Sequence, residues 1–333
     1  MAAGLLALTA EALSQAAELA EALGVRGPSR ASAAASADRS IARVLLAEAG
    51  LPTPQGTRVE SHQDAAAAAL WTGYPVVLRP LANLGYYGAI RADKAEDLHT
   101  AWTFAHTAAL AAETAPGAVL LEQAPDGDRV TLQTVTSESR TGVVAAVRTT
   151  FTNYPLFQPS SHLVTAEDMD PDLAQLAARA IQALGVQHGV GHVHTVMTVL
   201  GPVITDVAAH LQGDGVPELV RLATGVDLLL AAIQTATGQN PALIPTRAAS
   251  AAVALIRARS TGTVTGQGFD RKYLDGPWLA RLAWEAPLGT PVEVFPASVL
   301  ARCVVTGSDP DACLANLAQA RQAVRVTIQP DHP

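Results

Sequence analysis

Apolar positions recur along the chain with two different periods, one helical and one alternating. Residues 9–23 repeat Ala and Leu at helical spacing, place Glu on the opposite side and stop at Gly24. The same pattern, with an N-cap at Asp38 and a capping box at Ser61, predicts helices over residues 38–49, 61–71, 95–112, 172–184, 218–224, 226–238 and 310–323.

Short runs of apolar and β-branched residues lie between these helices. They predict strands over residues 74–80, 89–92, 118–123, 130–135, 142–150, 251–257 and 291–295. The polar, Pro-containing stretch 154–165 favours a loop near a site, and residues 241–245 favour a linker. Strands and helices interleaved in this order predict an α+β fold.

Residues 191–214 form the segment around which the other elements are organised. The runs 193–200 and 203–209 are rich in Val, Thr and Ile and flank Gly201-Pro202, so they predict an antiparallel hairpin. In this hairpin His194 lies opposite or nearly opposite Asp206. The period of two places one set of side chains on a single face, namely His192, His194, Asp206, Ala208 and His210. The other face, which includes Val193 and Thr205, is predicted to pack into the core.

Imidazoles and a carboxylate grouped on rigid strands have three interpretations. Neutral imidazole nitrogen and carboxylate oxygen are ligands of zinc and of non-haem iron. The same groups serve acid/base chemistry near neutral pH. Alternatively, His192 and His210 are hydrogen-bonded at the ends of the hairpin and have only a structural role. The residues alone leave all three open.

Composition narrows the class of ligand. The 333-residue chain has a net charge of −8 and no basic cluster, which disfavours a nucleic-acid surface. It has no apolar run of about 18 residues, and its first residues lack a basic region and include Glu11, against a signal peptide. Cys303 and Cys313 fit neither a disulfide framework nor a zinc motif. We expect a cytoplasmic protein that binds a small molecule and neither nucleic acid nor membrane.

Four segments occur in a characteristic order: DRSIARVLLAEAGLPTP, GYPVVLRP, VLLEQAPDG and GVGHVHTVMTVLGPVITDVAAHLQGDGVPELVRLATGVDL. The ordered set resembles the ATP-grasp superfamily, and within it the L-amino-acid ligases of the bacilysin-synthetase type. The resemblance implies an ATP-grasp fold, with two α+β lobes around a cleft and a small C-terminal α+β lobe. It divides the chain into a remnant of a shortened N-terminal domain (1–37), the ATP-grasp core (38–240) and the C-terminal lobe (241–333).

The resemblance also implies roles for individual residues in nucleotide binding. The two lysines that hold ATP phosphates in the family are matched by Arg39 and Arg79, which keep the charge but not the compact ammonium geometry. The adenine hinge falls on the consecutive residues Glu122, Gln123 and Ala124. A carboxylate expected at the ribose is matched by Arg129. Nucleotide recognition is therefore preserved only in part.

The metal positions depart most from the family pattern. The first Mg²⁺ ligand of the family falls on His194 and the second on Asp206, while the third position is Ala208. The arginine that steadies the acyl-phosphate falls on His210, which carries a positive charge only when protonated. Replacing an anionic oxygen by neutral nitrogen at His194 disfavours Mg²⁺ and favours zinc or another transition metal, with His194 and Asp206 as tentative ligands.

Three functions follow from these departures. The first is a repurposed enzyme of amino-acid or peptide biosynthesis, in which His192, His194, Asp206 and His210 act on a small amino-acid-like substrate without ATP. The second is an active ATP-dependent carboxylate–amine ligase, and the third is a non-catalytic binding or partner protein. The cofactor is left unknown, weak or absent ATP binding is expected, and a homodimer is the assembly to test. Ala substitution at His194 or Asp206 is predicted to abolish function with little change in melting temperature.

Overall fold

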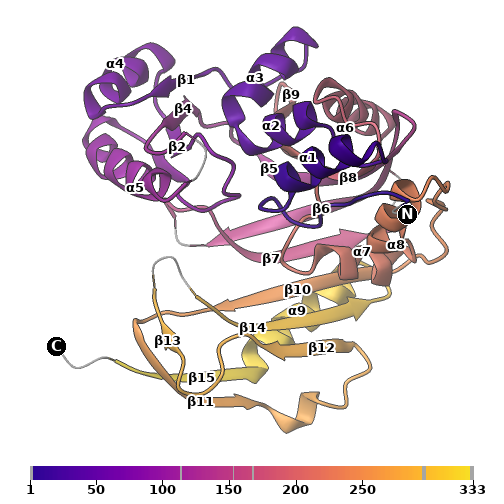
Figure 1. Cartoon of the computed structure of the whole chain (residues 1–333). Coiled ribbons are helices and arrows are strands. Elements are labelled where there is room, and N and C mark those ends of the chain that lie inside the picture. Colours follow the sequence, from indigo (N-terminus) through magenta and orange to yellow (C-terminus); the bar gives the residue numbers. More distant parts are fainter. Residues whose placement is uncertain (1–2, 113–114, 153, 167–168, 295–297, 331–333) are drawn as a thin grey trace.

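A computed structural model describes residues 3–112, 115–152, 154–166, 169–294 and 298–330. Three antiparallel sheets organise these residues (Figure 1). None of the helices among them is long and apolar enough to cross a membrane. The α+β class expected from the sequence is confirmed by this arrangement.

The first sheet forms a small lobe with helices on one side. Its strands, in spatial order, are β1 (Gly56–Val59), β4 (Val119–Gln123), β2 (Val76–Pro80) and β3 (Ile90–Ala92). Helices α4 (His62–Thr72) and α5 (Leu98–Leu110), the latter preceded by a 3-10 turn at Ala95–Asp97, close a core around Leu78, Trp102 and Leu121. Ser61 accepts a hydrogen bond from the backbone N–H of Asp64, so the predicted cap of α4 is confirmed.

The second sheet is the largest element of the molecule and has eight strands. Their spatial order is β12 (Leu279–Trp284), β14 (Val299–Gly307), β10 (Ser250–Arg257), β7 (Gln158–Thr165), β6 (Arg140–Thr152), β5 (Asp128–Ser137), β8 (Gly189–Thr198) and β9 (Gly201–Ala208). Strand β7 pairs with β10, so one sheet continues from the predicted core into the predicted C-terminal lobe.

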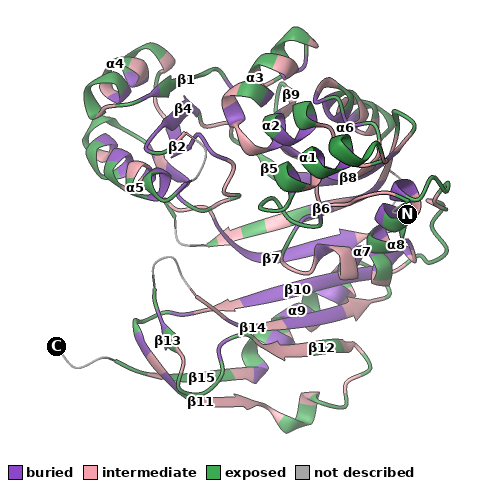
Figure 2. Ribbon diagram, viewed as in Figure 1, coloured by how far each residue is buried: buried purple, intermediate pink, exposed green. Residues whose placement is uncertain are grey.

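Helices cover the large sheet. Helices α1 (Leu13–Leu23), α2 (Arg30–Ala37), α3 (Arg39–Glu48) and α6 (Pro171–Ala183) lie over its β8–β9 end (Figure 1). Helix α7 (Val216–Thr224) packs on β10 and β7, and α8 (Leu228–Ala236) packs on β8 and β5. Helix α9 (Pro310–Ala323) packs against β14. The third sheet contains, in spatial order, β13 (Pro291–Val292), β11 (Gly262–Phe269) and β15 (Val324–Gln329). A 3-10 turn spans Arg271–Tyr273. Figure 2 shows buried positions along β7 and β10 and exposed positions on the outer sides of α1 and α3.

Two expectations are corrected by the fold, and one further helix is added. Residues 154–165 were expected as a loop, yet 158–165 form β7, because pairing on both edges satisfies the backbone of this polar run. The added helix is α2, in the Ser/Ala-rich segment before Asp38 for which the sequence indicated no element, and Ser29 caps it. Thr205 was expected on the core face, but a bulge between the His194 and Thr195 pairs lets Ile204 take the buried position instead.

Candidate functional site

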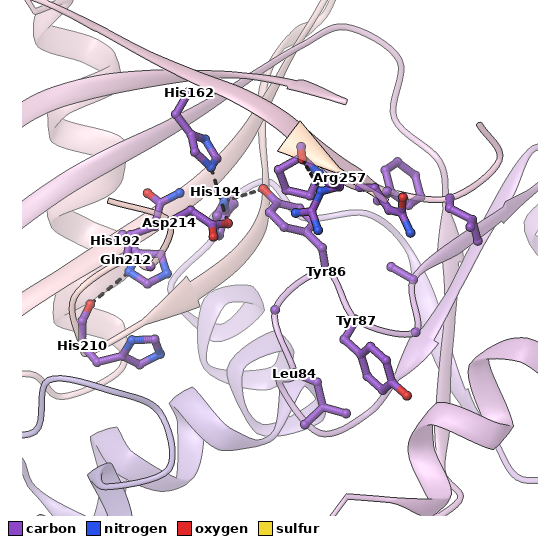
Figure 3. Close-up of a pocket in the computed structure, with 18 of the residues that line it drawn as sticks. Leu84, Tyr86, Tyr87, His162, His192, His194, His210, Gln212, Asp214 and Arg257 are labelled. Atoms are coloured by element: carbon purple, nitrogen blue, oxygen red, sulfur yellow. Dashed lines mark hydrogen bonds and ion pairs between the residues drawn. The ribbon is translucent and has the colours of Figure 1, made fainter. Parts of the chain in front are cut away.

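The β8–β9 hairpin has the register expected from its sequence. His194 pairs with Asp206 and His192 with Ala208. The His192 ring lies edge-to-face against both His194 and His210, with ring centroids 5.0 and 5.1 Å apart respectively. Ala208 has no side chain beyond Cβ. The three imidazoles therefore form a row along one wall of a cleft (Figure 3).

Hydrogen bonds fix the tautomer of two of these rings. Nδ1 of His192 lies 3.0 Å from the carbonyl oxygen of His210, and Nδ1 of His210 lies 2.8 Å from the carbonyl oxygen of Leu211. Because a carbonyl only accepts, Nδ1 carries the proton in each case, and Nε2 of the neutral ring is left as the basic nitrogen. His194 differs, since its Nδ1 faces two hydroxyls, those of Thr131 at 2.8 Å and Tyr86 at 3.1 Å.

Burial keeps the row neutral at physiological pH. It lowers the pKa of His194 to about 4 and also lowers the pKa of His192 and of His210. His210 consequently supplies no positive charge at pH 7. Neutral rings of this kind can accept a proton or a hydrogen bond at Nε2.

Asp206 does not face solvent but lies against Arg39. The Nε and Nη2 atoms of Arg39 donate to Oδ2 of Asp206 at 3.1 and 3.0 Å. The guanidinium, which is 1% exposed, also donates to the carbonyl oxygens of Pro80, Ala82 and Gly85 and to Oδ1 of Asn83. Every donor direction of Arg39 is thereby used within the protein.

Arg79 and Arg43 complete a buried ionic cluster. Arg79 donates to Glu122 at 2.6 Å and lies 3.4 Å from Asp206, and Arg43 donates to both oxygens of Glu122 at 3.1 Å. Burial by itself raises the pKa of Asp206, yet Arg39 and Arg79 hold that pKa well below its ordinary value. Burial lowers the pKa of Arg39 to about 10, so this pair is ionised at neutral pH.

The loop between β2 and β3 divides the cleft. It carries Tyr86, whose ring packs edge-to-face against Phe151 and His194 at centroid distances of 4.9 and 5.5 Å. One side of Tyr86 holds a cavity of about 50 Å³, lined in part by Arg79, Glu122 and Asp206. The other side holds a cavity of about 380 Å³ lined by the histidine row. A third opening of about 850 Å³ reaches the same row from α1.

The 380 Å³ cavity contains polar residues that the sequence interpretation missed. Nδ1 of His162 lies 2.9 Å from Oγ1 of Thr149, and its Nε2 lies 3.7 Å from Oδ2 of Asp214. Arg302 approaches the other oxygen of Asp214 at 3.4 Å, and Arg257 lines the wall. Figure 3 shows His162, Asp214 and the histidine row on the side of the cleft that faces Tyr86 of the loop. Asp214, between two glycines, has a φ of 57°, a signal of local constraint that only coordinates reveal.

The predicted site residues thus fall into two groups. His192, His194 and His210 lie together on an open wall, whereas Arg39, Arg79, Glu122 and Asp206 form the closed cluster. Gln123 lines the 50 Å³ cavity. The backbone N–H of Ala124 donates to Pro75 at 3.1 Å.

Mg²⁺-ATP does not fit these residues as they are arranged. Both carboxylates that would face a metal or a nucleotide are engaged by guanidinium groups, and the cavity directly beside them measures about 50 Å³. Within the described residues, no group of three or more His, Cys, Asp or Glu side chains is placed to hold a metal ion.

A family model and a relative of known sequence both match this chain. The family model described as "Carbamoyl-phosphate synthase L chain, ATP binding domain" matches residues 38–243. The uncharacterized protein y4rH of Sinorhizobium fredii (strain NBRC 101917 / NGR234) is 26% identical over 280 residues, which cover 80% of this chain and 55% of that protein. This chain therefore spans about half the length of that relative.

Two solved structures illustrate the similarity in fold. An L-amino acid ligase from Bacillus licheniformis superposes with a TM-score of 0.82 at 19% identity, covering 98% of this chain and 80% of that one. The biotin carboxylase domain dimer of the Hydrogenobacter thermophilus 2-oxoglutarate carboxylase, in complex with MgADP, ADP and bicarbonate, gives a TM-score of 0.73 at 18% identity, with coverages of 95% and 72%.

Proposed function

The chain belongs to the carbamoyl-phosphate synthase L chain ATP-binding family of the ATP-grasp superfamily, and from this premise we propose that its cleft serves an ATP-independent reaction on a small amino-acid-like substrate. The fold is that of an ATP-grasp ligase. The chemistry proposed for this cleft differs from carboxylate–amine ligation.

The ionic cluster is the observation that carries the proposal. The N–H groups of Arg39 all donate to Asp206, to the side-chain amide oxygen of Asn83 or to one of three backbone carbonyl groups. No N–H group therefore remains to bind a phosphate. Asp206 in turn is held by two arginines and offers no free oxygen pair to Mg²⁺. Breaking the cluster to admit Mg²⁺-ATP would leave buried charges unpaired, which costs several kcal/mol.

The 380 Å³ cavity is the proposed substrate site. Its volume lies within the range of small-ligand pockets. Asp214, which Arg302 approaches at one oxygen and His162 at the other, is the proposed neighbour of an ammonium group, and Arg257 lies in the wall where a carboxylate would bind. The basic Nε2 atoms of His192 and His210 are the groups proposed to accept a proton from such a substrate.

Ligation remains a second candidate because of one specific observation. The similarity to the Bacillus licheniformis L-amino acid ligase extends over 98% of this chain, so the architecture of a carboxylate–amine ligase is present. That activity requires Arg39 and Arg79 to release Asp206 and Glu122 when nucleotide binds. Binding without catalysis is the remaining outcome, and the experiment below separates all three.

The test combines calorimetry with product detection. Isothermal titration with Mg²⁺-ATP is expected to show no binding in the micromolar range, and thermal shifts with amino acids and dipeptides are expected to identify a ligand. His192→Gln and His210→Gln should abolish turnover of that ligand while leaving its binding within about tenfold. Micromolar Mg²⁺-ATP affinity with amino-acid-dependent ADP release would establish the ligase instead. Ligand binding that survives without any turnover would support the binding protein.

Metal content and assembly belong to the same proposal. Elemental analysis of the purified protein tests whether His194 and Asp206 hold zinc or another transition metal, and sedimentation tests for a homodimer. A solved relative is a biotin carboxylase domain dimer. We propose a homodimer here on that similarity, to be judged by the measured mass.

A further inference from the structure

Beyond the proposed function, we infer that the 50 Å³ cavity behind Tyr86 is a binding subsite for one compact oxyanion, a phosphate or carboxylate group. The cavity lies where the family resemblance places the nucleotide, and its lining includes the ion-paired carboxylates of Glu122 and Asp206. Arg79 and Arg129 both contribute to its wall, together with Gln123. Three separate observations point to an anion.

The first observation is the charge balance of the buried cluster. Arg39, Arg43 and Arg79 contribute three guanidinium groups, and their partners Asp206 and Glu122 contribute only two carboxylates. The side chains of all five are at most 13% exposed. One positive charge is therefore uncompensated in a region poorly reached by water, and buried charges are normally paired.

The second observation is the environment of Arg129. Its guanidinium carbon lies 4.6 Å from the centre of the Phe157 ring and 5.4 Å from that of Phe151. Among the described residues, no carboxylate lies at ion-pair distance from the guanidinium group of Arg129, and this group makes no hydrogen bond. By contrast, Arg91 pairs with Asp93 at 2.8 Å. Burial lowers the pKa of Arg129. The two rings thus hold a second, largely desolvated positive charge at the cavity.

The third observation is an unused donor in the same wall. Nε of Arg79 is buried and has no hydrogen-bond partner within the described part of the chain. A buried guanidinium N–H without an acceptor costs free energy, and an anion in the adjoining cavity would supply the acceptor. Since a water needs roughly 10–15 Å³ of such volume, 50 Å³ holds a few waters or one oxyanion group, but not a nucleobase with its ribose.

Inorganic phosphate and acetate are the probes, used with the full chain in a non-coordinating buffer at fixed ionic strength. Phosphate, acetate or both should raise Tm saturably, and calorimetry should show one site per chain. The more effective of the two identifies which oxyanion the subsite prefers. The absence of a saturable effect from both anions would overturn the inference.

Arg129→Gln removes the charge while keeping a polar side chain of similar reach. It should weaken binding of the effective anion by about tenfold or more, since a hydrogen bond to a charged group is lost. Arg140→Gln, at an exposed position on β6, is the matched control and should bind like the wild type. Equal weakening in both variants, or in neither, contradicts a specific subsite.

Two further measurements separate this inference from other roles. Without any anion, Arg129→Gln should melt no more than about 2 °C below the wild type, because it relieves an unpaired charge. A much lower Tm that anions do not change would mean that Arg129 only packs between the rings. If Mg²⁺-ATP displaces phosphate with micromolar affinity, the anion subsite stands while the ATP-independent function fails.

Discussion

At the scale of single residues, the chemistry of the cleft depends on which charges are buried together. Asp206 was expected on a wet wall where its removal would change stability little. Its residue is 6% exposed and its carboxylate is paired with Arg39 and Arg79, so removal of Asp206 is expected to destabilise the protein. His194 keeps the original expectation, because its partners are the hydroxyls of Tyr86 and Thr131 and not a buried charge.

Asp206→Asn should destabilise the protein by about 3–5 kcal/mol, because the two arginines lose a buried counter-charge. Urea unfolding at pH 7 measures the change. Asp93→Asn breaks the more exposed pair with Arg91 and is the control, with an expected loss below about 1 kcal/mol. Similar losses in the two variants would show that the cluster around Asp206 is not desolvated as described.

The histidine row should make stability depend on pH in mild acid. Burial lowers the pKa of His194 to about 4 in the folded protein, whereas an unfolded histidine titrates near 6.5. The unfolded chain therefore binds more protons between these values, and stability falls as pH drops from about 6.5 to 4, by up to about 1.4 kcal/mol per pH unit for each such histidine.

Urea unfolding at half-unit steps of pH checks this dependence. His192 and His210 shift in the same direction as His194 and add to the slope. His194→Gln should flatten it, while the lowered pKa of Asp206 matters only below about pH 4, where that carboxylate begins to lose its contribution. An unchanged slope in His194→Gln would contradict the burial of its neutral ring.

At the scale of elements, the loop between β2 and β3 decides how the cleft is partitioned. Gly88 has a φ of 76°, and a Cβ there would lie 2.5 Å from Cβ of Ala108 on α5. Gly85 has a φ of 63°, but a Cβ there meets nothing within 4 Å. Close packing against α5 therefore constrains one end of the loop that carries Tyr86, whereas the other end is open.

Gly88→Ala and Gly85→Ala make a matched pair. In both variants the left-handed backbone lowers the free energy of unfolding by about 1–2 kcal/mol. Overpacking lowers it by about a further 1–3 kcal/mol in Gly88→Ala. Chemical denaturation should rank Gly88→Ala as clearly less stable. Indistinguishable values would mean that the loop shifts freely away from α5 and does not hold Tyr86 in place.

At the scale of the whole molecule, one sheet crosses the boundary that the sequence suggested near residue 240. Strand β10 pairs with β7 over Ser250–Ala254 and with β14 on its other edge. The strands on either side of this boundary share backbone hydrogen bonds and cannot separate without exposing two strand edges.

Hydrogen exchange should therefore show β7, β10 and β14 opening together, with similar protection in the three strands. Mass spectrometry of peptides from each strand measures it. A chain ended at residue 240 should expose the β7 edge and aggregate. Protection of β7 that persists while β10 and β14 exchange rapidly would show that the two parts unfold independently, as the proposed domain division implies.

The sequence by itself determined the elements whose signals are local. The caps at Asp38 and Ser61 are confirmed, since capping depends on residues a few positions apart. The β8–β9 hairpin and the pairing of His194 with Asp206 follow from strand period and turn position, and they too are confirmed. The ordered segments were also sufficient to identify the ATP-grasp fold.

The tertiary structure alone decided which distant groups meet. Arg39 and Asp206 are far apart in the chain, and their pairing depends on how α3 and β9 pack, so no periodicity predicts it. His162 and Asp214 were missed for the same reason, because their approach depends on how β7 packs against the segment after β9. Period fixes the face on which a side chain lies, but packing between elements fixes its partner, its exposure to water and hence its charge state.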